Sequence, residues 1–208
     1  MNKEKELIDK LIDLAFAEDI GDGDHTTLSC IPATAMGKSK LLIKEAGVLA
    51  GIEVAKEIFN RFDPSMKVEV FINDGTEVKP GDVAMIVEGK VQSLLQTERL
   101  MLNVMQRMSG IATMTRKYAK VLEGTHTRVL DTRKTTPGMR ILEKMAVKIG
   151  GGVNHRIGLF DMILLKDNHV DFAGGIDKAI NRAKDYCKEK GKDLKIEIEV
   201  RNFDELQQ

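Results

Sequence analysis

Hydrophobic positions recur at helical spacing near the N-terminus and then change to short β-type runs. Residues 5–17 carry five apolar residues at helical spacing, which predicts an amphipathic helix that ends at the GDGD of 21–24. β-type runs follow at 40–46, 68–73 and 83–89, and a helical pattern at 52–62 separates the first two. The first part of the chain is therefore predicted to be an α+β unit with antiparallel strands.

A long helical pattern extends from about Leu94 to Leu122. Its predicted apolar stripe consists of Leu100, Val104, Met108, Ile111, Tyr118 and Leu122, with Met101, Met105 and Ala112 beside it. The polar residues Arg99, Asn103 and Gln106 fall on another face. Gly110 suggests a kink or a close contact with another element.

Beyond this helix the pattern alternates between strands and helices. Strands are predicted at 128–132, 161–167 and 195–200, helices at 138–149 and 176–191, and a further helix begins at NFDEL. Such alternation is typical of a parallel sheet or a (β/α) barrel. A closed barrel has about eight strands, so these strands suggest the front part of a longer protein.

The overall composition is that of a globular protein with balanced charge. The 208 residues are 42% hydrophobic and 31% charged, with 32 Lys and Arg against 32 Asp and Glu, which argues against a nucleic-acid binder. No apolar run is long enough for a membrane span, and MNKEKELIDK lacks the features of a signal peptide. Cys30 and Cys187 lie far apart in the sequence, which fits packing residues in a reduced, cytoplasmic setting better than a disulfide or a zinc site.

Positive charge is concentrated in residues 129–158. The cations are Arg133, Lys134, Arg140, Lys144, Lys148 and Arg156, and the only acids are Asp131 and Glu143. The segment is also interrupted by TTPG and by GGG at 150–152, whose backbone N–H groups could approach an anion or could simply reverse the chain. The cations at 140, 144 and 148 share one helix face, and a solvated stripe there is as good an interpretation as phosphate binding.

Polar residues follow each predicted strand of the second part. Arg133 and Lys134 follow the first strand, Lys166 the second, and Glu197 and Glu199 lie on one side of the third. Because ligands bind at the carboxyl ends of parallel strands, these residues predict a site for a multiply anionic substrate: a phosphate, a diphosphate or a dicarboxylate. The glutamates suggest a sugar hydroxyl, a magnesium shell or a developing positive charge as their partner.

Other candidate motifs are incomplete. GDGDHTT resembles the start of a calcium loop, but its twelfth position from Asp22 is Ala33 rather than Glu, so Asp22, Asp24 and His25 are interpreted as capping and turn residues. No phosphate-binding G-x-x-x-x-G-K-[ST] motif occurs. DGTEVKPGDVAMIVEG resembles the strands of a biotinyl or lipoyl carrier. That fold needs a modifiable Lys at a hairpin tip, and SMKV at 65–68 lies on the wrong side of these strands, so the resemblance is interpreted as one of shape only.

Four motifs together resemble a known family. They are ERLMLNVMQRMSGIAT at 98–113, DTRKTTPGMRILEKMAVKIGGGVNHRIGL at 131–159, ILLKDNH at 163–169 and IEIEV at 196–200. In this order and spacing they resemble the quinolinate phosphoribosyltransferases, and the resemblance extends over nearly the whole chain from EDIGDGDHTT onward.

This resemblance implies an α/β fold, with an N-terminal α+β sandwich domain over residues 1–112 followed by part of an open (β/α) barrel over 113–208. The implied enzyme of NAD biosynthesis, a nicotinate-nucleotide pyrophosphorylase, transfers a phosphoribosyl group from 5-phosphoribosyl 1-diphosphate to quinolinate with decarboxylation. The products are nicotinate mononucleotide, diphosphate and carbon dioxide, and Mg²⁺ accompanies the diphosphate substrate.

The resemblance also implies roles for individual residues. The quinolinate carboxylates would be held by Arg133, His155 and Arg156, and by Arg99 of a neighbouring subunit in a homodimer. Lys134 and Lys166 would lie near the diphosphate and the substrate, and Glu199, rather than Glu197, near the ribose.

Two alternatives remain open at this level. One is a paralogue of the same fold with another substrate, of the type associated with molybdate transport, although DTRKT together with NHRIG favours quinolinate. The other is a non-catalytic fragment, because further barrel strands of the family have no counterpart before Gln208.

Overall fold

The computed structural model describes residues 3–208. It divides into two compact units, Met1–His155 and Arg156–Gln208, which are described separately.

The first unit contains two antiparallel sheets and five helices among its described residues. In chain order they are α1 (Lys3–Asp19), α2 (His25–Cys30), β1 (Met36–Leu42), β2 (Gly47–Val48), α3 (Ile52–Phe62), β3 (Lys67–Val70), β4 (Glu77–Val78), β5 (Val83–Lys90), α4 (Val91–Val121) and α5 (Arg140–Ile149). Of these, α2 and the short strands β2 and β4 were not predicted. The strand order is β1-β5-β3 in the larger sheet, and β2 pairs with β4 in the smaller one. The antiparallel α+β unit predicted from the sequence is confirmed.

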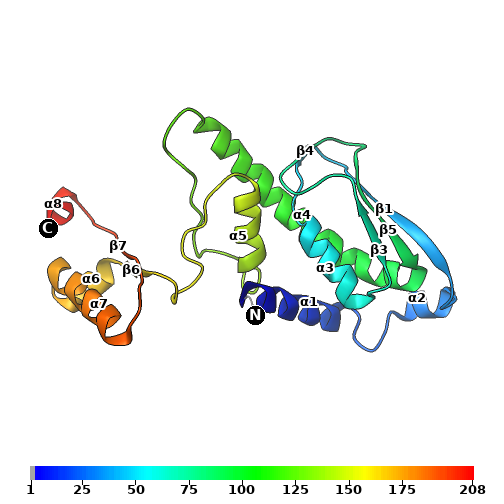
Figure 1. The fold of residues 1–208 in the computed structure, drawn as a ribbon, viewed down its shortest axis with the longest axis horizontal. Helices are drawn as coiled ribbons and strands as arrows, with labels where there is room; N and C mark the ends of the chain where they lie inside the picture. The colour runs from blue at the N-terminus through cyan, green and yellow to red at the C-terminus, as the bar shows by residue number, and fades with distance from the viewer. Residues whose placement is uncertain (1–2) are drawn as a thin grey trace. The chain divides into compact units, whose positions relative to one another are not determined.

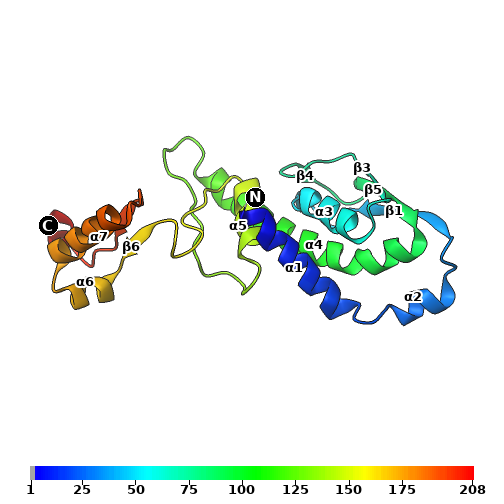
Figure 2. The ribbon, with the colours of Figure 1, turned by 60° about the horizontal axis from the view of Figure 1, so that its bottom comes forward.

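The long helix α4 organises the first unit. It contacts β1 and β5 of the larger sheet, and α3 runs beside it (Figures 1 and 2). Its buried face includes Met101, Val104, Met105, Met108 and Ala112, and α5 packs against it through Leu142 and Ala146. Burial of this stripe against the sheet explains why one helix continues over 31 residues.

Short polar caps define where the helices begin. Asp24 accepts a hydrogen bond from the backbone of Thr27 at 3.0 Å, so it caps α2 as the sequence predicted. Helix α3 begins after Gly51, which has no side chain to act as a cap. Asp74 supplies the acceptor instead, 2.9 Å from the backbone nitrogen of Ile52.

The second unit is a small parallel β–α arrangement. Its elements are β6 (Ile163–Leu165), α6 (Asp167–Ala173), α7 (Ile176–Lys190), β7 (Ile196–Ile198) and α8 (Phe203–Gln207). β6 and β7 pair in parallel, and Leu165, Val170, Ile176, Ala179 and Ala183 form the buried core. The predicted parallel arrangement is confirmed for these two strands, although α6 was not predicted. Residues 3–208 contain no closed barrel.

Two local predictions are wrong, one about the segment 128–132 and one about Tyr118. The segment 128–132 is not a strand but makes a single parallel bridge, Leu130 to Val153. Beyond this bridge the backbone donors of Lys134 and His155 bond to side chains instead of to a neighbouring strand, which ends the pairing. Tyr118, expected in the apolar stripe of α4, is 60% exposed, because the buried face turns to Thr115 at this end of the helix.

Candidate anion-binding site

Two segments of the charged region are held together in the first unit. The backbone of Val153 donates to Val129 at 2.8 Å, and Asp131 donates to Val153 at 3.2 Å. Asp131 Oδ1 also accepts the N–H of His155 at 2.9 Å. The DTRKT and NHR motifs, about twenty residues apart in sequence, therefore meet at this point.

Arg133 lies in the loop that follows this junction. Its Nε is buried and has no hydrogen-bond partner among residues 3–208, although the residue as a whole is half-buried. Lys134, next to it, has an exposed side chain. A buried donor without a partner needs an acceptor, and a bound carboxylate would provide one.

Lys144 does not belong to a solvated stripe, and no phosphate role is needed to explain it. Its side chain is only 2% exposed, and its ammonium group donates to Asp131 and, at 3.2 Å, to the carbonyl oxygen of His155. Lys148, one turn further along α5, is exposed. The two lysines were predicted to share one helix face, but Lys144 forms a buried ion pair and Lys148 is solvated.

The glycines after α5 serve packing. A Cβ on Gly150 would lie 2.5 Å from the carbonyl oxygen of Ala112 and 2.7 Å from Cβ of Thr115, and one on Gly152 would lie 2.7 Å from the side chain of Val147. Gly150 and Gly152 thus allow close approach to α4 and to α5. The interpretation of these two as a loop open to a ligand is wrong, because protein atoms already fill the space.

Glu143 anchors the TTPG loop. Arg107 of α4 donates to Glu143 Oε1 through Nε at 3.0 Å and through Nη2 at 2.7 Å, and the backbone of Thr136 donates to Oε2 at 3.3 Å. Burial alone would raise the pKa of the Glu143 carboxyl, but these bonds outweigh it and hold the pKa below its ordinary value of 4.5.

The second unit holds Arg156, Lys166 and Glu199 of the predicted site residues. Lys166 at the end of β6 donates to Glu199 Oε1 at 2.6 Å, and both side chains are substantially exposed. Glu199 follows β7, and its backbone nitrogen donates to the carbonyl of Leu165. Arg156 Nη1 lies 3.4 Å from the carbonyl oxygen of Met162. Parallel pairing of β6 with β7 therefore brings a cation and a carboxylate together at the carboxyl ends of the strands.

Arg99 is separate from these groups along the helix. It is exposed on α4, eight residues before Arg107, which corresponds to about 12 Å along a helix axis. Arg107 contacts the TTPG loop, whereas Arg99 lies two turns nearer the start of the helix.

Comparison with known proteins shows which family the chain resembles over both of its parts. The sequence profile described as "Quinolinate phosphoribosyl transferase, N-terminal domain" matches residues 24–109, and the corresponding C-terminal domain profile matches residues 111–208. A relative from Synechocystis sp., named "Probable nicotinate-nucleotide pyrophosphorylase [carboxylating]", is 42% identical over 202 residues, which cover 97% of this chain and 67% of the relative. The chain belongs to the quinolinate phosphoribosyltransferase family.

Other members of this family show the same extent of similarity. "Quinolinate phosphoribosyltransferase [decarboxylating] 1b" of Nicotiana tabacum is 46% identical over 94% of this chain and 56% of its own length. The crystal structure of NadC from Streptococcus pyogenes superposes with a TM-score of 0.87 at 40% identity, covering 95% of this chain and 69% of that chain. The chain thus spans only a little more than half the length of the Nicotiana relative.

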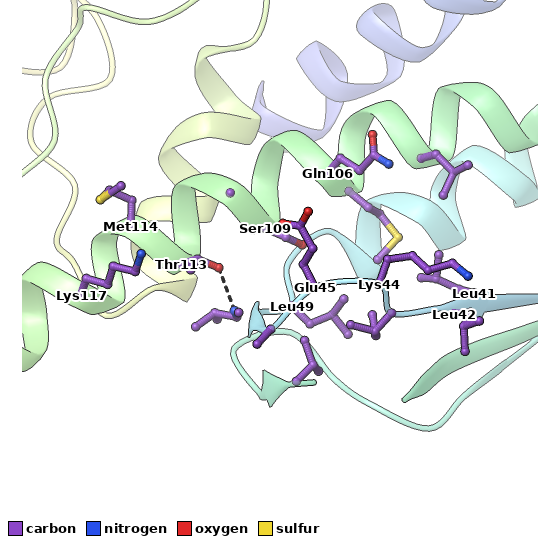
Figure 3. Close-up of a pocket in the computed structure, with 18 residues that line it drawn as sticks. Leu41, Leu42, Lys44, Glu45, Leu49, Gln106, Ser109, Thr113, Met114 and Lys117 are labelled. Carbon is purple, nitrogen blue, oxygen red and sulfur yellow. Dashed lines mark hydrogen bonds between the residues drawn. The ribbon is translucent and has the colours of Figure 1, made fainter. Parts of the chain in front are cut away.

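A separate groove lies elsewhere in the first unit. It has a volume of about 530 Å³ and runs between α4 and residues 41–49, with Gln106, Ser109 and Thr113 along the helix side (Figure 3). Its floor is mainly apolar, including Leu49 and Met105, and no predicted site residue lines it. Gly110 opens onto it, and a Cβ there would meet nothing within 4 Å, so the close contact expected at Gly110 is absent. An anionic ligand suits the charged loops better than this groove.

Residues 3–208 contain no group of three or more His, Cys, Asp and Glu side chains that could hold a metal ion. None of the helices in the same range is long and apolar enough to cross a membrane.

Proposed function

We propose that this protein transfers a phosphoribosyl group from 5-phosphoribosyl 1-diphosphate to quinolinate with loss of carbon dioxide. The products are nicotinate mononucleotide and diphosphate, a step of NAD biosynthesis. The observation that carries the proposal is the junction of DTRKT with NHR, which is found in a chain whose family is established. The names of the relatives from tobacco and Synechocystis agree with this activity.

The dicarboxylate is proposed to bind the arginines and the histidine. Quinolinate carries two adjacent carboxylates, and planar guanidinium groups bind such groups bidentately. The buried, unpartnered Nε of Arg133 supports this role, because a carboxylate oxygen would satisfy it. We propose Arg133, His155 and Arg156 as ligands in one chain and Arg99 as a ligand from the second subunit of a homodimer.

The phosphoribosyl donor is proposed to bind the lysines and Glu199. Lys134 and Lys166 would neutralise the leaving diphosphate, and Glu199 would stabilise the positive charge that develops on the ribose. The bond from Lys166 to Glu199 supports Glu199, rather than Glu197, as the carboxylate associated with this lysine. Mg²⁺ is proposed to accompany the diphosphate, because it is commonly bound through substrate phosphates and one or two carboxylates.

The cations also have a role after decarboxylation. Loss of the ring carboxylate leaves an ylid-like carbon with negative charge, which cationic side chains stabilise electrostatically. Arg133 and Arg156 would therefore bind the substrate and also stabilise the charge that forms from it.

The cytoplasm is the proposed compartment, on the basis of the sequence features alone. Relatives in this family include proteins named as chloroplastic, from Arabidopsis thaliana, and as mitochondrial, from Nicotiana tabacum.

Titration of quinolinate into the folded chain tests the proposed site. Arg133→Ala should weaken binding about 100-fold or more, because it removes the charged partner of a carboxylate. Arg128→Ala, an exposed arginine five residues earlier, is the matched control and should leave the affinity within about twofold of wild type. Wild-type affinity in the Arg133 variant, or no binding by the unmodified chain, would contradict the proposal.

A further inference from the structure

A buried polar cluster lies behind the proposed quinolinate site. Its members are Lys144, Asp131 and Asn154, together with the backbone of His155. The side chains of Lys144 and Asp131 are 2% and 7% exposed. Asn154 Nδ2 donates to Asp131 Oδ2 at 2.5 Å and to the carbonyl of Lys144 at 2.8 Å. The three side chains of this cluster belong to residues outside the set proposed to touch the substrate.

The cluster fixes both backbone groups of His155. The N–H of His155 donates to Asp131 Oδ1 at 2.9 Å, and its carbonyl oxygen accepts from Lys144 at 3.2 Å. Asp131 is two residues before Arg133 in the same loop. One carboxylate therefore sets the distance between the backbone that carries His155 and the backbone that carries Arg133.

Helix α5 holds the other end of the same loop. Arg140 Nε donates to Thr135 Oγ1 at 3.0 Å, and Glu143 accepts from the backbone of Thr136. Together with Lys144, three side chains from two turns of α5 thus contact the loop that contains DTRKTT. These three charged side chains of α5 therefore hold the loop in place.

A buried ion pair contributes no more to stability than well-packed apolar residues usually do. Apolar residues of similar volume often replace such a pair without loss of stability, whereas removal of one partner leaves an uncompensated charge. Charge and hydrogen bonding do provide fixed geometry, since each oxygen of Asp131 has defined donors. The cluster is thus better suited to setting positions than to stabilising the core.

We propose that Lys144 is a positioning residue, which acts through Asp131 and Asn154 to hold His155 at the distance from Arg133 that a dicarboxylate requires. The inference rests on the proposed function for the identity of the ligand. Its structural part, the fixing of the His155 backbone, does not depend on that function.

Lys144→Met and Lys148→Met form a matched pair for the test. Both remove an ammonium group from α5, but Lys144 is buried in the cluster and Lys148 is exposed. Quinolinate titration should show affinity reduced about 10- to 100-fold for Lys144→Met, as is typical when a supporting contact is lost, and unchanged within about twofold for Lys148→Met. Amide hydrogen exchange should become at least about tenfold faster at His155 in Lys144→Met, with exchange in α3 unchanged.

A double variant separates positioning from stability. Asp131→Leu combined with Lys144→Met replaces the ion pair by an apolar pair and should recover the midpoint of urea unfolding that either single variant loses. Quinolinate affinity should remain low, because the donors and acceptors for His155 are absent. If affinity returns together with stability, the cluster is merely structural and the inference is overturned.

The remaining outcomes are also distinct. Unchanged exchange at His155 in Lys144→Met overturns the inference whether or not quinolinate binds. If the unmodified chain binds no quinolinate while exchange at His155 responds as expected, the proposed function fails and the positioning of this backbone is upheld.

Discussion

Gly150 shows how one residue controls the contact between two helices. Its missing side chain allows the end of α5 to approach the backbone of Ala112 in α4, and Arg116 Nε donates to the Gly150 carbonyl at 3.0 Å. Because α5 carries the side chains that hold the DTRKT loop, this glycine contributes to the site without facing it. Gly110, forty residues earlier, has open space around it.

Gly150→Ala should therefore destabilise the protein and Gly110→Ala should not. The added methyl group at position 150 would overlap backbone and side-chain atoms, which costs about 1–3 kcal/mol. At position 110, inside a helix, alanine should stabilise by about 0.5–1 kcal/mol. Urea unfolding of the two variants measures both effects, and equal midpoints would contradict the packing role of Gly150.

At the scale of elements, α5 connects the core of the first unit to the charged loops. One face packs Leu142 and Ala146 against α4, and another presents Arg140, Glu143 and Lys144 to the loop. The pairs Glu143 with Arg107 and Lys144 with Asp131 use both acids of segment 129–158. Arg133 and Arg156, which form no salt bridge among residues 3–208, keep their charge available for an anion.

Glu143→Gln should lower stability in a pH-dependent manner. A carboxyl whose pKa is depressed by folding contributes stability that is present above its unfolded value, here 4.5, and is lost as the pH falls through the lower folded value. The variant should therefore be less stable than wild type by about 1 kcal/mol at pH 7. The difference should shrink as the pH falls below 4.5 and disappear once the pH is below the depressed pKa of the folded state.

Urea unfolding at pH 7 and at acid pH measures this difference. Glu18→Gln, an exposed glutamate of α1, is the control and should show no comparable dependence. A difference at pH 7 that persists unchanged in acid would contradict the role assigned to the Glu143 carboxylate.

At the scale of the whole molecule, the proposed function includes a second subunit, which would supply Arg99. Arg133 and His155 belong to the first unit, and Lys166 and Glu199 to the second. Arg99 is on the part of α4 that lies before the loop contacts. Assembly of a homodimer is therefore part of the proposed function.

Mixing two inactive variants tests this arrangement. If Arg99 acts across a dimer, co-expression of Arg99→Ala with Arg133→Ala should restore quinolinate binding at about a quarter of all sites. About half of the dimers would be mixed, and each would have one intact site of two. The stoichiometry of titration measures this fraction, with each variant alone as the control. No recovery in the mixture would show that Arg99 does not serve a neighbouring chain.

The sequence by itself determined the elements with strong local patterns. Helix α3 begins at Ile52 and ends at Phe62, the limits predicted, because its apolar spacing and flanking residues act locally. Strand β5 and the parallel pair β6 and β7 were also predicted from runs of apolar residues. The four family motifs, which include DTRKT and NHR, were sufficient to predict the family, since they depend on residue identity and order alone.

Only the tertiary structure decided what the charged residues of segment 129–158 do. Lys144 and Lys148 share one spacing along the helix, yet one is buried against Asp131 and the other is solvated. The glycines at 150 and 152 face protein atoms, which no local pattern indicates. The burial of a side chain and the identity of its partners depend on which distant segment packs against it. A local sequence pattern does not identify that segment.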